Sequence, residues 1–201
     1  MMKMLKMKDI VMVALLTAVY FIAYMICSTV STMFGPFGHS ISPGICSLLA
    51  GIVLYFVSRK VGKFLQFTLM QAIIMVLFSI MGAGYLPWFI TSMIGAIIAD
   101  IIASRESKPS LVKLGIASGI FHVGQALGSI VPSMFFMESY KEEWVSRGQT
   151  PEQMDEMIKM ATGVIGVLAV VVVFILAFVG ILIGHLILGK HFAKKDLDVA
   201  A

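Results

Sequence analysis

The stretch ATGVIGVLAVVVVFILAFVGILIGHLIL, residues 161–188, decides the fold class, because it carries no charged side chain over its whole length. A helix needs about 20 predominantly apolar residues to cross the roughly 30 Å hydrocarbon core of a bilayer. The rest of the chain has a similar character: 59% of its residues are hydrophobic, 13% are charged, and the mean hydropathy is +0.98. Soluble domains have about 25% charged residues. The sequence therefore predicts an all-α, multi-pass integral protein of the cell membrane.

Five further apolar segments precede this one, separated by turn-forming or basic residues. We expect six transmembrane helices at about residues 10–33, 43–57, 64–81, 88–103, 111–136 and 161–188, in a single domain over residues 1–201. Pro43 suits the first turn of the second helix. The basic residues 1–8 resemble the start of a signal peptide, but the apolar run after them is too long and lacks a small-x-small cleavage site. We therefore assign this run to the first helix.

The distribution of basic residues indicates the orientation. With a cytoplasmic N-terminus and six crossings, twelve of the 15 lysine and arginine residues fall in cytoplasmic segments, and only Lys141, Arg147 and Lys159 fall outside. Cytoplasmic connections of membrane proteins are enriched in these residues. Both termini are therefore expected in the cytoplasm. The net charge of +4 fits this membrane orientation, and we predict no nucleic-acid partner.

The connection between the last two helices, residues 138–160, is the long outer loop. Thr150, Pro151 and Gln153 are typical of a helix start, with a capping hydroxyl, a proline in the first turn and a glutamine that closes a capping box. An apolar stripe at helical spacing follows, formed by Met154, Met157, Ile158 and Ala161. We expect a short amphipathic helix here. It either rests on the membrane surface or forms a lid over an outward-facing pocket.

Pairs of small residues one helical turn apart recur along the chain. Such pairs allow two helix backbones to approach closely in lipid. Most of them are predicted to pack helices within the protein; the pairs are Ala14/Ala18, Gly95/Ala99, Gly115/Gly119, Gly124/Gly128 and Gly180/Gly184.

Three of these features together carry a family resemblance. The pair Ala14-x-x-x-Ala18, the motif from Gly95 to Asp100 with Arg105 just beyond it, and six helices in 201 residues resemble the S components of energy-coupling factor (ECF) transporters. More narrowly, the chain resembles the Trep_Strep group of such proteins. The resemblance implies a subunit that captures a vitamin or similar micronutrient. It implies docking of Ala14 and Ala18 on a transmembrane coupling subunit, with two cytoplasmic ATPases that use ATP.

The resemblance also implies a substrate site near the outer face, where aromatic and polar residues are available. The candidate substrate-binding residues are His39 in the first outer connection, Tyr85 and Trp88 at the second, and Gln71, His122 and Gln125 within the helices. Each has an ordinary alternative, because aromatic residues also anchor membrane interfaces and polar residues also bond neighbouring helices. Asp100 is expected to form a salt bridge with Arg59 or Arg105, or to face the coupling subunit.

Several motifs are absent from the sequence. There is no GxxxxGK[ST], HExxH or GxSxG, so we expect no enzymatic activity and no cofactor or metal site of the chain's own. The aromatic and methionine residues suit haem, a siderophore complex or a vitamin equally. A self-sufficient small transporter or channel, working as a homo-oligomer, is the alternative function, although no inverted repeat is evident. Cys27 and Cys46 are expected as buried thiols, with a disulfide as the alternative.

Overall fold

The regular structure of the chain is helical. The computed structural model describes residues 3–104 and 109–200, and every regular element within them is a helix. The helices are α1 (Met7–Ser31), α2 (Gly35–Lys60), α3 (Gln66–Ile80), α4 (Leu86–Ala103), α5 (Leu111–Phe135), α6 (Met137–Ser146), α7 (Pro151–Ala161) and α8 (Gly163–Ala200), with a short 3-10 turn at Thr32–Phe34.

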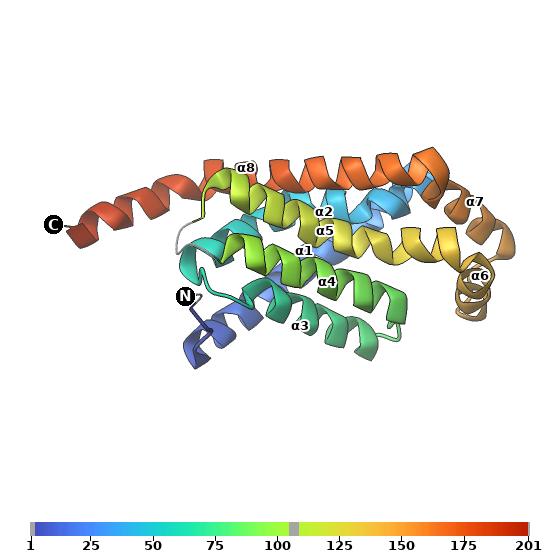
Figure 1. Cartoon of the computed structure of the whole chain (residues 1–201), viewed down its shortest axis with the longest axis horizontal. Coiled ribbons are helices and arrows are strands. Elements are labelled where there is room, and N and C mark those ends of the chain that lie inside the picture. Colours follow the sequence, from blue (N-terminus) through green and yellow to red (C-terminus); the bar gives the residue numbers. More distant parts are fainter. Residues whose placement is uncertain (1–2, 105–108, 201) are drawn as a thin grey trace.

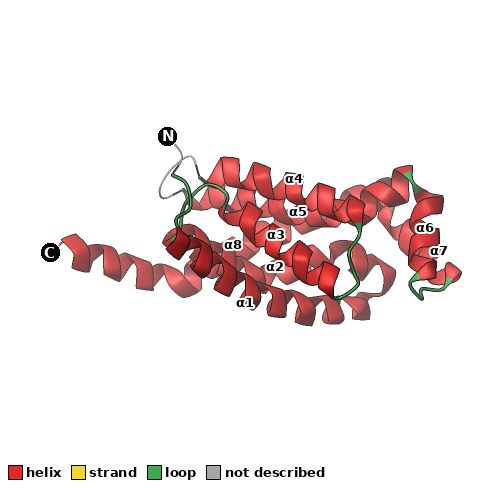
Figure 2. Ribbon diagram, turned by 90° about the horizontal axis from the view of Figure 1, so that it is seen from below, coloured by secondary structure: helices red, strands yellow, loops and turns green. Residues whose placement is uncertain are grey.

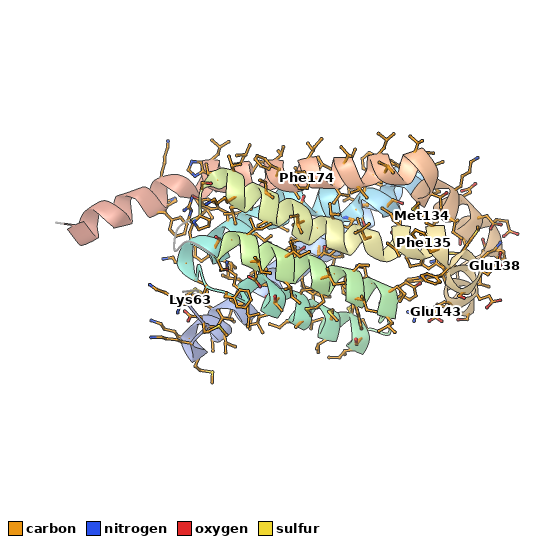
Figure 3. The ribbon with its side chains drawn as sticks, viewed as in Figure 1. Lys63, Met134, Phe135, Glu138, Glu143 and Phe174 are labelled. Carbon is orange, nitrogen blue, oxygen red and sulfur yellow. The ribbon has the colours of Figure 1, made fainter. Side chains whose placement is uncertain are left out.

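Six of these helices run along one another as an elongated bundle, and α6 and α7 sit across one end of it (Figure 1). We call this end the cap end, and α6 with α7 the cap. The chain ends lie at the other end, where α8 continues beyond the bundle (Figure 2). Charged side chains gather at both ends, with Glu138 and Glu143 at the cap and Lys63 near the N-terminus (Figure 3). An apolar middle between two polar ends is the arrangement that a bilayer requires.

Five of the described helices are long and apolar enough to cross a membrane: α1, α2, α4, α5 and the Gly163–Phe192 part of α8. The third predicted span corresponds to α3, which has only 15 residues and a length of about 22 Å. This helix is shorter than the predicted 64–81 because Leu65 before it and Gly82 after it both have positive φ. The prediction of a multi-pass membrane protein is confirmed.

The start of α2 differs from the prediction of a loop before Pro43. The helix begins at Gly35, with Pro36 in its first turn, so Pro43 lies inside it. Proline lacks the N–H that would bond the carbonyl four residues earlier. Here the Ser42 hydroxyl donates to that carbonyl, the one of His39, at 2.9 Å. The helix therefore continues through Pro43, and His39 lies on its second turn instead of in a loop.

Glycines bring two pairs of helices into backbone contact. A Cβ placed on Gly95 of α4 would lie 2.9 Å from the Cα of Gly124 on α5, and one on Gly51 of α2 would lie 2.5 Å from the backbone of Gly180 on α8. Gly115 and Gly119 instead leave room for the rings of two phenylalanines of α8. These predicted pairs therefore pack helices inside the protein.

The Ala14/Ala18 pair behaves differently from the glycine pairs. Ala14 is half-buried and Ala18 is exposed, on the side of α1 that also exposes Leu15, Val19 and Ile22. The buried side of α1 carries Val13, Thr17 and Tyr20 and their helical neighbours. The outer face of α1 is thus not covered by any described part of the chain.

Asp100 caps α3 from the neighbouring helix α4. The backbone N–H groups of Phe67 and Thr68 donate to its two carboxyl oxygens at 3.1 and 2.8 Å, and the Thr68 hydroxyl donates at 2.7 Å. The first N–H groups of a helix lack partners inside the helix. The expected salt bridge to Arg59 is wrong, because that guanidinium lies over the Tyr55 ring, 5.2 Å from its centroid. Arg105 lies outside the described residues.

Candidate functional site

A cavity of about 250 Å³ lies under the cap, between α1, α2, α5 and the connection from α3 to α4. We call it the inner cavity. Its aromatic lining comes from Tyr24, Phe78, Tyr85, Trp88, Tyr140 and Trp144, and its polar lining from Ser28, Ser31, His39, Ser42, Gln125 and Ser129. Ligand pockets are usually concave and largely apolar, with a few polar groups. The inner cavity fits that description.

Helix α6 closes the inner cavity through aromatic contacts with the α3–α4 connection. The Tyr85 ring centroid lies 5.7 Å from that of Tyr140 and 5.9 Å from that of Trp144. Tyr140 and Trp144 are one turn apart on α6, so both face the same side of the helix. Burial raises the pKa of Tyr85 to about 12 and also raises the pKa of Tyr140. Both phenols are therefore neutral at physiological pH.

Arg147 holds α6 in this position. Its Nη2 donates to the carbonyl oxygen of Gly84 at 2.8 Å, its Nε donates to the Glu143 carboxylate at 3.0 Å, and its guanidinium lies over the Trp144 ring at 5.3 Å. One side chain thus connects α6 to the α3–α4 connection and covers one face of Trp144. This contact fixes the C-terminal end of α6 to the connection between α3 and α4.

A buried hydrogen-bond network forms the floor of the inner cavity. Gln125, on α5, donates through Nε2 to Oε1 of Gln71 on α3 at 2.9 Å and to the hydroxyl of Tyr20 on α1 at 3.4 Å. The Tyr20 hydroxyl lies 3.1 Å from Nε2 of His122, and Nδ1 of His122 lies 2.8 Å from the Ser118 carbonyl. Since a carbonyl only accepts, Nδ1 carries the proton and the Tyr20 hydroxyl donates to Nε2.

This network is neutral and joins three helices beneath the cavity. Gln71 and His122 are fully buried and do not line the cavity, whereas Gln125 reaches it. The Nε2 of Gln71 has no hydrogen-bond partner among the described residues. Buried polar groups are costly unless bonded. An additional acceptor, such as a water, would satisfy one of the two N–H groups of this amide.

A second cavity of about 410 Å³ adjoins the first, and we call it the vestibule. It lies between the start of α2, helix α6 and helix α7. His39, Tyr140 and Trp144 line both cavities and therefore lie where the two adjoin. The remaining lining of the vestibule is glycine, proline, polar side chains and methionine: Gly35, Pro36, Gln149, Gln153, Met154, Glu156 and Met157.

The predicted amphipathic helix is α7, and its start is confirmed. Thr150 accepts from the backbone N–H of Gln153, and the Gln153 side chain accepts from the backbone N–H of Thr150. Met154 and Ile158 of the predicted stripe are buried against the rest of the protein, and Met157 lines the vestibule. Helix α7 therefore packs on the cap end over the vestibule. Helix α6, the other helix of the cap, lies mostly within the segment 138–160, where a loop was predicted before the amphipathic helix.

The structure brings most of the candidate residues to one place. His39, Tyr85, Trp88 and Gln125 line the inner cavity. Sequence reasoning missed Tyr24 on α1 and the two α6 residues, although Tyr140 and Trp144 have the i, i+4 spacing of one helix face. This spacing, within the segment predicted as a loop, was the sequence feature that could have indicated helix α6.

The two cysteines are buried free thiols, and the Sγ of Cys46 lies 3.6 Å from the Tyr24 carbonyl oxygen. Across residues 3–104 and 109–200, no group of three or more His, Cys, Asp or Glu side chains is placed to hold a metal ion.

A family model described as "Hypothetical bacterial integral membrane protein (Trep_Strep)" matches residues 7–194. No curated protein and no solved structure gives a significant match.

Proposed function

The chain belongs to the Trep_Strep family of bacterial integral membrane proteins, and we propose that it is the substrate-binding subunit of an ECF-type importer. In this proposal it captures a vitamin-like or other micronutrient molecule outside the cell. Haem and siderophore complexes are among the candidates. A coupling subunit and two cytoplasmic ATPases then drive delivery.

The inner cavity is the observation that carries this proposal. It lies at one end of a membrane-embedded bundle, is lined from α1, α2, α5, α6 and the α3–α4 connection, and is covered by the cap. A channel needs a continuous polar path, whereas a capture subunit needs an enclosed pocket that opens to one side. The fastening of α6 by Arg147 supports a pocket that closes over its occupant.

The membrane placement follows from the charges. We place the cap end outside and both chain ends in the cytoplasm, because the end opposite the cap holds most of the basic residues. The short α3 then counts as a sixth crossing, and its length requires that the bilayer or the neighbouring helices adapt locally. An outward-facing cavity is what an importer requires.

The outer face of α1 is our proposed docking surface for the coupling subunit. Ala14 and Ala18 allow another helix backbone to approach closely. Unlike the glycines of the other pairs, which contact neighbouring helices, Ala18 is exposed and Ala14 is only half-buried. The chain has no P-loop motif, so ATP hydrolysis that drives transport would take place on a partner.

A second candidate function uses the same surface differently. If the outer face of α1 binds another copy of this chain, the protein is a self-sufficient transporter or channel that works as a homo-oligomer. The two proposals differ in what is bound to α1 in the membrane.

Purification from the native membrane in mild detergent, followed by mass spectrometry, tests both proposals. We expect a polytopic coupling protein and two P-loop ATPases to copurify with the wild-type chain and to be lost from Ala18→Trp. The matched control is Val171→Trp, on the exposed face of α8, which should retain all three. Recovery of the chain alone, as an oligomer that Ala18→Trp disrupts, would support the second function, provided that a known membrane complex survives the same procedure.

A further inference from the structure

The inner cavity and the vestibule adjoin at His39, Tyr140 and Trp144, which line both of them. We infer that they take one elongated ligand, with an uncharged planar aromatic body in the inner cavity and a cationic arm in the vestibule beside Glu156. This inference rests on the proposed capture function and names the chemical class of what is captured.

The inner cavity excludes a charged group. None of its lining residues is an aspartate, glutamate, lysine or arginine. A buried charge is costly unless an opposite charge and hydrogen bonds compensate it. The part of the ligand that enters this cavity therefore carries no net charge.

The shape and chemistry of the lining favour a flat ring. Phe78 and Trp88 form one wall, with ring centroids 5.2 Å apart, and Tyr140 contributes to the cap above. Aromatic rings pack against one another in offset or edge-to-face geometry. Gln125 at the floor can exchange hydrogen bonds with a polar ring edge.

Trp144, which lines both cavities, carries an unused hydrogen-bond donor. The indole N–H of Trp144 is buried and has no hydrogen-bond partner among the described residues. Buried tryptophan N–H groups usually have a partner. A ligand that passes from one cavity to the other and carries an acceptor at this point would supply one.

The vestibule contributes a single formal charge. Glu156 is the only aspartate, glutamate, lysine or arginine in its lining, and no described residue forms an ion pair with it. Glu156 is exposed, and its carboxylate favours a cation over an anion in the vestibule by a modest amount. The arm of the ligand that lies in the vestibule is therefore positively charged.

Three probes that share a naphthalene ring system and differ in the charge of their polar group test this inference: 2-naphthalenemethanol (neutral), 2-naphthylmethylamine (cationic) and 2-naphthoate (anionic), all at neutral pH. The full-length protein in lipid nanodiscs is heated with each probe, and the fraction that remains monodisperse gives the shift in apparent unfolding temperature. Binding to the folded state raises this temperature in a concentration-dependent way. The dependence on probe concentration gives each affinity.

We expect the amine to bind about fivefold more tightly than the alcohol, and the carboxylate to bind more weakly than either. Glu156→Gln should bring the amine and the alcohol within about twofold, with the alcohol unchanged. The matched control is Glu152→Gln, an exposed residue of α7 outside the vestibule lining, which should keep the preference. Ser129→Phe, which fills the inner cavity, should abolish the shifts and so exclude binding through the lipid.

Equal binding of carboxylate and amine, an amine preference that survives Glu156→Gln, or the absence of any shift with the alcohol and amine would each overturn the inference. Such a result would leave the copurification of the coupling subunit and ATPases unaffected. Failure of the ligand class and failure of the proposed function are therefore separate outcomes.

Discussion

Replacing Asp100 with alanine tests how much of the stability of the bundle depends on one cap between helices. Helix α3 begins after Leu65, whose side chain makes no capping bond, and Leu65 has a φ of 70°. The carboxyl group of Asp100 instead accepts from Phe67 N–H and Thr68 N–H, and Phe67 is fully buried. Lipid offers no replacement acceptor for these groups.

The magnitude follows from counting the groups left without a partner. Each unsatisfied buried N–H costs about 1–2 kcal/mol, so losing two costs about 2–4 kcal/mol. The Thr68 hydroxyl can rotate toward its own helix and adds little. Asp100→Asn keeps one acceptor oxygen, so about half of the loss, 1–2 kcal/mol, is expected.

Unfolding by SDS titration in mixed micelles measures these differences. Asp155→Ala is the matched control, because it removes an exposed carboxylate that pairs with Lys141 on the cap, where a loss of about 0–1 kcal/mol is expected. The reasoning would be refuted if Asp100→Ala cost no more than this control. If Asp100→Ala were stable but no longer copurified with a coupling subunit, the residue would belong to the docking surface.

Four further substitutions test other parts of the structure. Gly124→Ala places a Cβ 2.8 Å from the facing backbone of α4, so we expect a loss of about 1–3 kcal/mol in the same titration, and an unchanged midpoint would contradict the close contact. Ser42→Ala removes the hydroxyl that donates to the His39 carbonyl, which Pro43 cannot bond because it has no N–H. This loss should cost about 1 kcal/mol of stability. Gln125→Ala should weaken binding of 2-naphthalenemethanol about tenfold, because Gln125 lines the inner cavity. His122→Ala should lower the free energy of unfolding by about 2–4 kcal/mol and change this affinity less than threefold, because His122 is buried away from the cavity. Equal effects on affinity would place both side chains in the site.

Local patterns predicted the parts of the fold that local interactions determine. The capping box of Thr150 and Gln153 and the apolar stripe of α7 need only neighbouring residues, and both are present. The glycine pairs were predicted for a similar reason, because a residue without a side chain in a membrane helix has few uses other than close packing. Contacts of this kind can be inferred before the partner is known.

The errors come from interactions that no short pattern reveals. The start of α2 was predicted eight residues late, because Pro43 resembles a helix start unless the Ser42 hydroxyl is known to take over the missing bond. The capping role of Asp100 joins residues more than thirty positions apart, so no short window contains both partners. In the site, the residues beside turns were predicted, and the α6 residues were missed because their helix was not expected.

Both tryptophans of the chain, Trp88 and Trp144, line the inner cavity. When tryptophan is excited selectively over tyrosine, the emission therefore originates at the candidate site. An occupant that stacks on either indole will change the intensity or wavelength of this emission without any attached label. Fractions of a culture medium could be screened for quenching of the purified chain, so the protein itself can serve as the detector in the search for its natural ligand.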